Sequence, residues 1–191
     1  MERLRLKIVQ AGEPVLRAPA RELTVEEILS PEVRNLVELM RETMHDAPGV
    51  GLAAPQIGIS LRFAIIEDRP EYHRSLDPAA LADRERAPVP FHVLFNPKIT
   101  ARSDETVAFY EGCLSVAGFS ALVPRARRVT VEYLDETAAP QRLEASGWYA
   151  RILQHEIDHL DGHLYLERMD PATFSTVENL TRYSNPAKPP K

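Results

Sequence analysis

The sequence predicts an α+β fold in which short antiparallel strands surround a central buried helix. The helix is expected to begin after Ser146, a candidate N-cap, and to end before Gly162, a candidate C-cap. Apolar side chains occupy nearly all of its faces, which is typical of a helix in the middle of a molecule. Short apolar or alternating stretches predict strands at 63–66, 92–95, 107–110, 121–123, 129–134 and 142–145. Strands combined with one buried helix indicate the α+β class.

A second helix is predicted at 31–44, packed on the outside of the strands. Ser30 is a candidate N-cap, Pro31 suits the first helical position, and apolar residues recur at helical spacing. The methionines of this helix are expected to fill the core rather than to bind a ligand. Residues 67–90 are polar and contain several prolines, which predicts a surface excursion with a helical turn near 78–84.

Two proline-containing pairs are predicted to act as boundaries. The Asn-Pro pair at 96–97 is expected to end the strand before it, and the Asp-Pro pair at 170–171 to open a last short helix. The chain is expected to form one domain over residues 1–183. Residues 184–191 are rich in proline and lysine, so a disordered tail is predicted there.

Composition narrows the function classes. One cysteine in 191 residues excludes an internal disulfide and fits a reducing compartment. The net charge of -5 gives no basis for direct nucleic-acid binding, and no apolar run approaches the roughly 20 residues of a membrane span. The first ten residues lack the features of a signal peptide or a presequence, so a bacterial cytoplasm is expected. An organelle matrix is the alternative if a presequence was removed.

The central helix carries an H-E-x-x-H motif. On a helix, His155 and His159 lie on one face about 6 Å apart along the axis, so both imidazoles can reach one metal ion. Glu156 then lies beside that ion, where a carboxylate can take a proton from water. The alternative is a chance match whose histidines make ordinary hydrogen bonds.

A glycine-rich stretch at 49–58 predicts a loop whose backbone approaches another group closely. It contains three glycines, two alanines and one proline, and Gln56 is its only side chain with amide donors. A phosphate-binding loop is disfavoured because the stretch lacks the G-K-[ST] ending and follows a helix rather than a strand. A tight structural loop is the remaining alternative.

The only cysteine, Cys113, lies in the stretch Glu-Gly-Cys-Leu-Ser at 111–115. A lone cysteine is commonly a small buried hydrophobic residue. With a histidine pair elsewhere in the chain, however, a thiolate is a reasonable third ligand for zinc or iron.

Together these three stretches resemble the peptide deformylases, which carry G-x-G-x-A-A-x-Q, E-G-C-x-S and H-E-x-x-H in the same order. The resemblance covers about residues 5–180. The stretches at 115–119 and 145–148 look like the type 1 branch found in mitochondria and plastids. The implied activity is a metal-dependent hydrolase that removes the N-formyl group from the formyl-methionine of newly synthesised polypeptides and releases formate.

The resemblance also implies the roles of individual residues. One divalent metal ion is expected on Cys113, His155 and His159; Fe²⁺ is expected physiologically, and Zn²⁺ or Ni²⁺ in purified protein. Glu156 is expected to carry protons. The side-chain amide of Gln56 and the backbone N–H of Leu114 are expected to receive the developing negative charge, while Gly51 leaves bare backbone for an extended peptide. These catalytic residues are therefore Glu156, Gln56, Leu114 and Gly51.

For the substrate, the resemblance implies a methionine pocket in which Arg151 presents its aliphatic stem and keeps its charge outside. Glu111 is expected to orient a ligand, the alternative being a surface charge. Ser120 stands in a loop position where many bacterial members have an arginine, which changes how the peptide is held. The expected substrate-binding residues are Val50, Gly51, Phe109, Glu111, Gly112, Trp148, Arg151 and Ile152.

The expected partners are formyl-methionyl nascent peptides and, transiently, the ribosome, with no direct nucleic-acid or membrane contact. Docking through a long basic C-terminal helix, as in some bacterial members, is not expected because residues 171–183 contain a single base, Arg182.

Three other functions fit parts of the sequence. A zincin peptidase would take Glu178 as its third ligand, although the related metzincin pattern requires histidine where Tyr165 stands. A metal-stabilised binding module would keep the metal without turnover. A Cys-His thiol hydrolase would leave the H-E-x-x-H arrangement unexplained.

Overall fold

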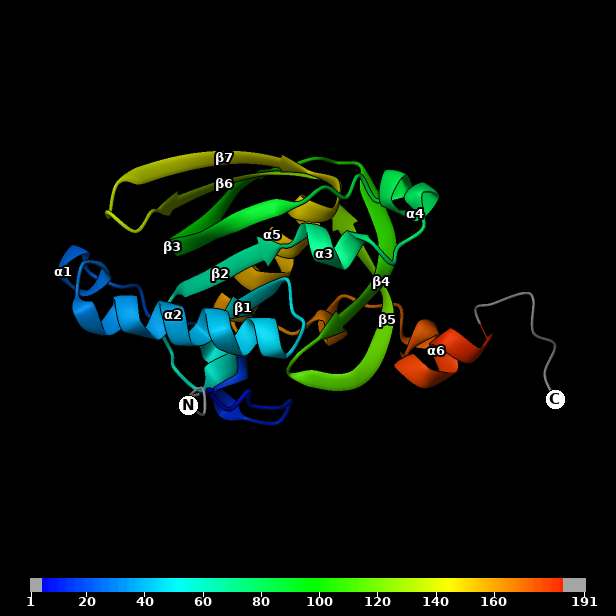
Figure 1. The fold of residues 1–191 in the computed structure, drawn as a ribbon, viewed down its shortest axis with the longest axis horizontal. Coiled ribbons are helices and arrows are strands. Elements are labelled where there is room, and N and C mark those ends of the chain that lie inside the picture. Colours follow the sequence, from blue (N-terminus) through cyan, green and yellow to red (C-terminus); the bar gives the residue numbers. More distant parts are fainter. Residues whose placement is uncertain (1–4, 184–191) are drawn as a thin grey trace.

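The computed structural model describes residues 5–183, and it contains two antiparallel sheets, in agreement with the predicted class (Figure 1). The tail expected at 184–191 lies outside the described residues. The larger sheet has the order β1-β2-β3-β6-β7 and the smaller one the order β4-β5-β8. The strands are β1 (Gly51–Ala53), β2 (Phe63–Asp68), β3 (Val89–Arg102), β4 (Thr106–Cys113), β5 (Val116–Ala126), β6 (Arg128–Leu134), β7 (Pro140–Ser146) and β8 (Ser175–Thr176).

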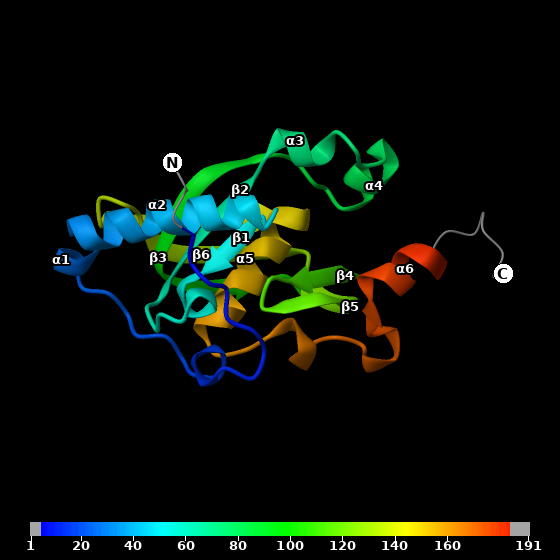
Figure 2. The same cartoon turned by 60° about the horizontal axis from the view of Figure 1, so that its bottom comes forward.

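The motif helix α5 (Gly147–Leu160) contacts strands of both sheets, including β1, β3, β5 and β7 (Figures 1 and 2). Ser146 takes the N-cap position but makes no side-chain capping hydrogen bond. Gly162 follows the helix at φ +82°, and a Cβ there would lie 2.9 Å from the backbone of the N-terminal segment, so glycine is required for both reasons. The helix therefore carries its motif into the centre of the fold.

Helix α2 (Pro31–Asp46) covers the β1–β2 side of the larger sheet (Figures 1 and 2). The Ser30 hydroxyl accepts a hydrogen bond from the backbone N–H of Val33, as predicted for the N-cap. Met40 and Met44 are fully buried in the cluster that joins this helix to the sheet. The core-filling role predicted for the methionines is confirmed.

The prediction that the Asn-Pro pair at 96–97 ends a strand is wrong. β3 continues to Arg102, and its register against β6 shifts between Phe95 and Lys98. Asn96 adopts φ +50°, and its side chain bonds to both the N–H and the carbonyl of Leu23, at 2.9 and 2.8 Å. A β-bulge thus accommodates the proline without ending the strand.

The excursion between β2 and β3 contains two short helices, α3 (Pro70–His73) and α4 (Pro78–Asp83), the second of which matches the predicted helical turn. Two contacts fix its returning end. Arg86 donates to both carboxylate oxygens of Asp68, at 2.7 and 2.9 Å. Gly147 at the start of α5 packs so closely that an added Cβ would lie 2.4 Å from the Cβ of Glu85. The excursion is therefore held against the first turn of the motif helix.

The C-terminal segment passes along the smaller sheet. The predicted helix at 171 is one 3₁₀ turn, after which β8 pairs with β5 and α6 follows. No helix in residues 5–183 is long and apolar enough to cross a membrane. The remaining helices are α1 (Val25–Ile28), α6 (Val177–Tyr183) and the 3₁₀ turns η1 (Pro14–Arg17), η2 (Ala54–Ile57), η3 (Tyr165–Glu167) and η4 (Pro171–Thr173).

Candidate metal centre

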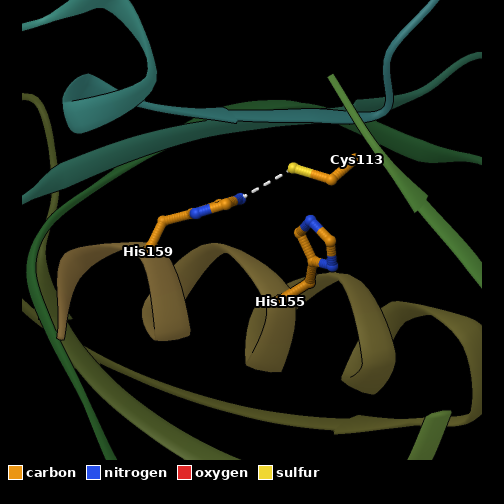
Figure 3. Close-up of side chains that lie close together, drawn as sticks. All are labelled: Cys113, His155 and His159. Atoms are coloured by element: carbon orange, nitrogen blue, oxygen red, sulfur yellow. Dashed lines mark hydrogen bonds between the residues drawn. The ribbon is translucent and has the colours of Figure 1, made fainter. Parts of the chain in front are cut away.

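Cys113 at the end of β4 faces His155 and His159 on α5 (Figure 3). One ligand atom from each residue lies within 4.8 Å of the other two, and the Cys113 Sγ is 3.2 Å from the His159 Nε2. The helical spacing places the two imidazoles together, with ring centroids 5.0 Å apart. A tertiary contact between β4 and α5 brings the thiol to them.

This cluster fits a transition-metal ion. Ligand bonds of about 2.0–2.3 Å allow one ion to reach all three donor atoms, and sulfur with imidazole suits zinc or iron. Burial raises the pKa of Cys113, but the charges and hydrogen bonds of His159 and His155 outweigh it and lower that pKa to about 5. The thiolate that a metal requires is thus the favoured form near pH 7.

A buried network of charges orients His155. The Glu111 Oε2 lies 3.0 Å from the His155 Nδ1, so the Nε2 is directed toward Cys113 and His159. Arg125 donates to both oxygens of Glu111 at 2.9 Å and pairs with Asp158. Although burial opposes it, the hydrogen bonds and charges of His155 and Arg125 hold the pKa of Glu111 well below its usual range. Glu111 is therefore a buried carboxylate that bonds to a candidate ligand, and the surface-charge alternative is wrong.

The expectation that Arg151 keeps its charge outside is wrong. The residue is 4% exposed, and its guanidinium points inward. It donates to the Glu111 Oε1 at 2.6 Å and to the carbonyls of Val123 and Val107 at 2.8 and 2.5 Å. These three acceptors only partly offset the cost of removing the charge from water, because burial still lowers the pKa of Arg151.

Glu156 is buried beside the candidate ligands, at 4% exposure, and its Oε2 has no hydrogen-bond partner among the described residues. Burial raises its pKa to about 7, against the opposing charges of His155 and His159. A Cβ on Gly51 would lie 2.3 Å from the Glu156 Oε1. A side chain at 51 would therefore displace the Glu156 carboxylate from this position, which is a reason for glycine that the sequence did not predict.

Gln56 reaches the ligands from the opposite wall. Its Oε1 accepts the Ala53 N–H at 2.9 Å, which orients the amide. Its Nε2 donates to the Ser115 hydroxyl at 3.3 Å and approaches the Cys113 Sγ at 3.5 Å. Leu114 lies in the turn directly after Cys113. Amide donors and the Glu156 carboxylate thus border the same space.

Two of the candidate ligands, Cys113 and His155, line a cavity of about 660 Å³. Phe109 does not line it: its ring packs behind Trp148, with centroids 6.3 Å apart. Ser120 lies in strand β5 rather than in a loop, and its buried hydroxyl donates to the Glu111 carbonyl at 2.8 Å. The predicted residues that do line the cavity are Val50, Gly51, Gln56, Glu111, Gly112, Leu114, Trp148, Arg151, Ile152 and Glu156.

The residues of this site that were not predicted include three charged side chains. Arg125 and Asp158 belong to the network behind His155, and Arg86 lines the cavity while bonded to Asp68. Asp158 has a sequence signal, because it lies inside the H-E-x-x-H motif. Arg125 and Arg86 have none, since their partners come from distant segments.

Glu178, the third ligand that a zincin peptidase would use, does not belong to this cluster. The Glu178 side chain is 78% exposed and pairs with Arg182 on the same helix, at 3.0 Å. Within residues 5–183, the only group of three metal-ligating side chains found is that of Cys113, His155 and His159. Cys113 is therefore the candidate for the third ligand position.

Comparison with known proteins identifies relatives along nearly the whole chain. Peptide deformylase 1A of Solanum lycopersicum, a chloroplastic protein, is 48% identical over 173 residues, which cover 91% of this chain and 62% of the plant protein. This chain therefore spans less than two thirds of that relative. Peptide deformylase 3 of Streptomyces avermitilis is 47% identical over 183 residues, covering 95% of this chain and 79% of the bacterial protein.

Solved structures agree with the sequence comparison. The class I type b peptide deformylase of Acinetobacter baumannii, bound to Met-Ala-Ser, superposes with a TM-score of 0.78 at 34% identity; the match covers 88% of this chain and 100% of that one. The family model for polypeptide deformylase matches residues 5–175. The chain belongs to the polypeptide deformylase family.

Proposed function

We propose that this chain removes the N-formyl group from formyl-methionine at the start of newly synthesised polypeptides and releases formate. The observation that carries the proposal is the buried Glu156 carboxylate, which borders a Cys-His-His ligand set and an amide donor in one cavity. A buried carboxylate with a pKa near 7 is suited to accept and return one proton. The Acinetobacter relative binds Met-Ala-Ser, which has the sequence of a deformylated product.

Cys113, His155 and His159 would hold one divalent ion. When bound, that ion supplies a Lewis acid that polarises the formyl carbonyl and lowers the pKa of water. We propose Fe²⁺ as the physiological ion, with Zn²⁺ or Ni²⁺ as substitutes in purified protein. Glu111 fixes the His155 ring through its Nδ1, which keeps the Nε2 available as a ligand atom.

Glu156 is the proton carrier of the proposed reaction. It takes a proton from water as the oxygen attacks the formyl carbon, and it returns that proton to the nitrogen as the carbon–nitrogen bond breaks. Formate and a free methionine amine result. Meanwhile the amide of Gln56 and the backbone N–H of Leu114 donate to the oxygen on which negative charge collects.

The methionine side chain is assigned to the part of the cavity that Val50, Trp148 and Ile152 line, while Gly51 and Gly112 present backbone to the peptide. We place the activity where translation starts with formyl-methionine, in a bacterial cytoplasm or, alternatively, an organelle matrix, with transient ribosome contact. The overall charge of -5 supports a peptide rather than a nucleic acid as the partner.

The test is amine and formate release from formyl-Met-Ala-Ser by protein purified without oxygen, with Met-Ala-Ser as the control peptide. Rapid release that a chelator stops is expected. No release by fully metallated protein would overturn the proposal. A Cys113→Ser variant distinguishes the deformylase from a zincin peptidase. The deformylase is expected to lose its metal and its activity in this variant, whereas a peptidase with Glu178 as its third ligand would keep both.

A further inference from the structure

We propose that Gln10 is a positioning residue for the reaction, because its side-chain amide holds the turn that carries the Leu114 N–H. The inference rests on the proposed function, in which this N–H donates to the oxygen where negative charge collects. It extends that function to the N-terminal segment, which lies outside the three sequence motifs. Gln10 is assigned no contact with the reacting atoms.

The turn between β4 and β5 places two parts of the site at once. Cys113, a candidate ligand, pairs with Val116 across the turn, so only Leu114 and Ser115 form the reversal. The regular register of the two strands is interrupted directly before it, between Gly112 and Cys113. A displacement of this turn would therefore move the candidate ligand and the Leu114 N–H together. Contacts from outside the hairpin can thus set the geometry of both.

Gln10 bridges the two sides of this turn. Its Nε2 donates to the Leu114 carbonyl at 3.0 Å, and its Oε1 accepts the Ala117 N–H at 3.3 Å. A carbonyl can only accept and a backbone N–H can only donate, so the two partners determine the orientation of the amide. Only two dihedral angles separate the Leu114 carbonyl from the N–H of the same residue. Holding the carbonyl therefore restricts the direction of the N–H.

The backbone on either side of Gln10 joins the turn to the opposite wall of the cavity. The Ala11 N–H donates to the Ser115 carbonyl at 2.8 Å. The Val9 N–H donates to the Gln56 carbonyl, also at 2.8 Å. This segment thus connects the two parts of the chain that supply the proposed donors. Donors that are held in advance need no rearrangement as the negative charge develops.

The position of Gln10 favours a role in the reaction over a role in the core. The residue is exposed, and it lines the same cavity as Cys113 and Glu156. Holding an exposed glutamine in one conformation costs side-chain entropy, and the residue buries little apolar area to offset that cost. Direct contact with the peptide is the alternative, and its loss would raise KM without lowering kcat.

The experiment measures kcat and KM for formyl-Met-Ala-Ser with the metal-loaded full chain. Gln10→Met keeps the length of the side chain and removes both hydrogen bonds. We expect kcat to fall by about two- to tenfold, the rate equivalent of one typical hydrogen bond, with KM unchanged and bound metal stoichiometric. Gln141→Met, at an exposed glutamine bonded to Asp135, is the matched control and should keep both constants.

Two further variants identify which hydrogen bond matters. At neutral pH, Gln10→Glu can still accept the Ala117 N–H but cannot donate to the Leu114 carbonyl, so its kcat should fall as in Gln10→Met. Gln10→Lys keeps a donor and loses the acceptor, so it should recover part of the lost kcat. Wild-type kcat in Gln10→Glu, or no recovery in Gln10→Lys, would overturn the role assigned to the bond with Leu114.

Three results with Gln10→Met would overturn the positioning role and leave the proposed function intact. An unchanged kcat would show that the turn does not need the amide. A rise in KM alone would assign Gln10 to the peptide. Loss of metal in proportion to activity would make its role structural. No release by the metal-loaded wild type would instead overturn the proposed function, and the positioning role with it.

Discussion

The two sides of the cavity are built on different physical interactions. Around His155, charged groups hold one another in a buried network that runs from Glu111 through Arg125 to Asp158. Where the methionine side chain is proposed to lie, the cavity wall includes the apolar side chains of Val50, Trp148 and Ile152. Two of the lining rings are packed from behind: the guanidinium of Arg84 lies 5.0 Å from the Trp148 ring, and Phe174 stacks against Phe119.

The difference predicts how each side responds to mutation. Removing one partner from a buried charge network leaves another charge unpaired, which typically costs about 3–5 kcal/mol. Removing one apolar side chain from a half-exposed surface loses only the part of the hydrophobic free energy that belongs to its buried area. We therefore expect mutations near the candidate ligands to reduce activity or stability strongly, and mutations in the apolar wall to change peptide binding only modestly.

The largest effect is expected from Glu156→Gln, which keeps the shape and removes the proton carrier. Turnover of formyl-Met-Ala-Ser should fall by about 10²–10⁴-fold, the usual contribution of general acid–base catalysis, while bound metal stays stoichiometric. Steady-state kinetics measures the turnover, and metal analysis measures the bound metal. Glu178→Gln, at a carboxylate paired on the surface, is the control and should match the wild type. Undiminished turnover in Glu156→Gln would favour a metal-stabilised binding module or another base.

Gln56→Leu tests the opposite wall of the same cavity. Loss of one donor to a developing negative charge typically lowers the rate by about 10²–10³-fold, and the metal should remain because Gln56 is not a candidate ligand. Gln141→Leu, which removes an exposed amide bonded to Asp135, is the matched control. Normal turnover in Gln56→Leu would contradict its assigned role.

Glu111→Gln breaks the network behind His155. Loss of such an outer hydrogen bond typically lowers metal affinity by about 10–100-fold. Loss of the buried carboxylate charge that pairs with Arg125 and Arg151 should lower the free energy of unfolding by about 3–5 kcal/mol. Competition with a chelator measures the metal affinity, and denaturant titration measures the free energy of unfolding. Because the pKa of Glu111 is depressed in the folded state, its contribution is present above the unfolded pKa and is lost as pH falls through the folded value. The variant should therefore differ most from the wild type at neutral pH, with Glu144→Gln, an exposed carboxylate, as the control.

The smallest effect is expected from Arg84→Ala. Stacking of a partly exposed guanidinium on Trp148 contributes about 0.5–1 kcal/mol, so KM for formyl-Met-Ala-Ser should rise about two- to fivefold with little change in kcat. Arg142→Ala, on the exposed strand β7, is the control. A fall in kcat as large as that of Gln56→Leu would remove the distinction between the two sides.

The local features of the site were predictable from the sequence. Helical periodicity places His155 and His159 on one face of α5, because positions four residues apart coincide on any α-helix. Capping chemistry placed the start of α2 at Ser30, since a serine hydroxyl can satisfy a free backbone N–H. The resemblance carried by three ordered motifs added Cys113, which periodicity alone could not join to the histidines.

The sequence by itself thus determined the motif helix, the candidate ligands and the family to which the chain belongs. Only the tertiary structure decided the inward turn of Arg151, the pairing of Arg125 with Asp158, and the close approach of the Glu156 carboxylate to Gly51. The reason is distance along the chain: Arg125 and Asp158 are 33 residues apart, and Glu111 and His155 are 44 apart. Local periodicity specifies which face a side chain occupies, whereas its partner depends on which distant segment packs against that face.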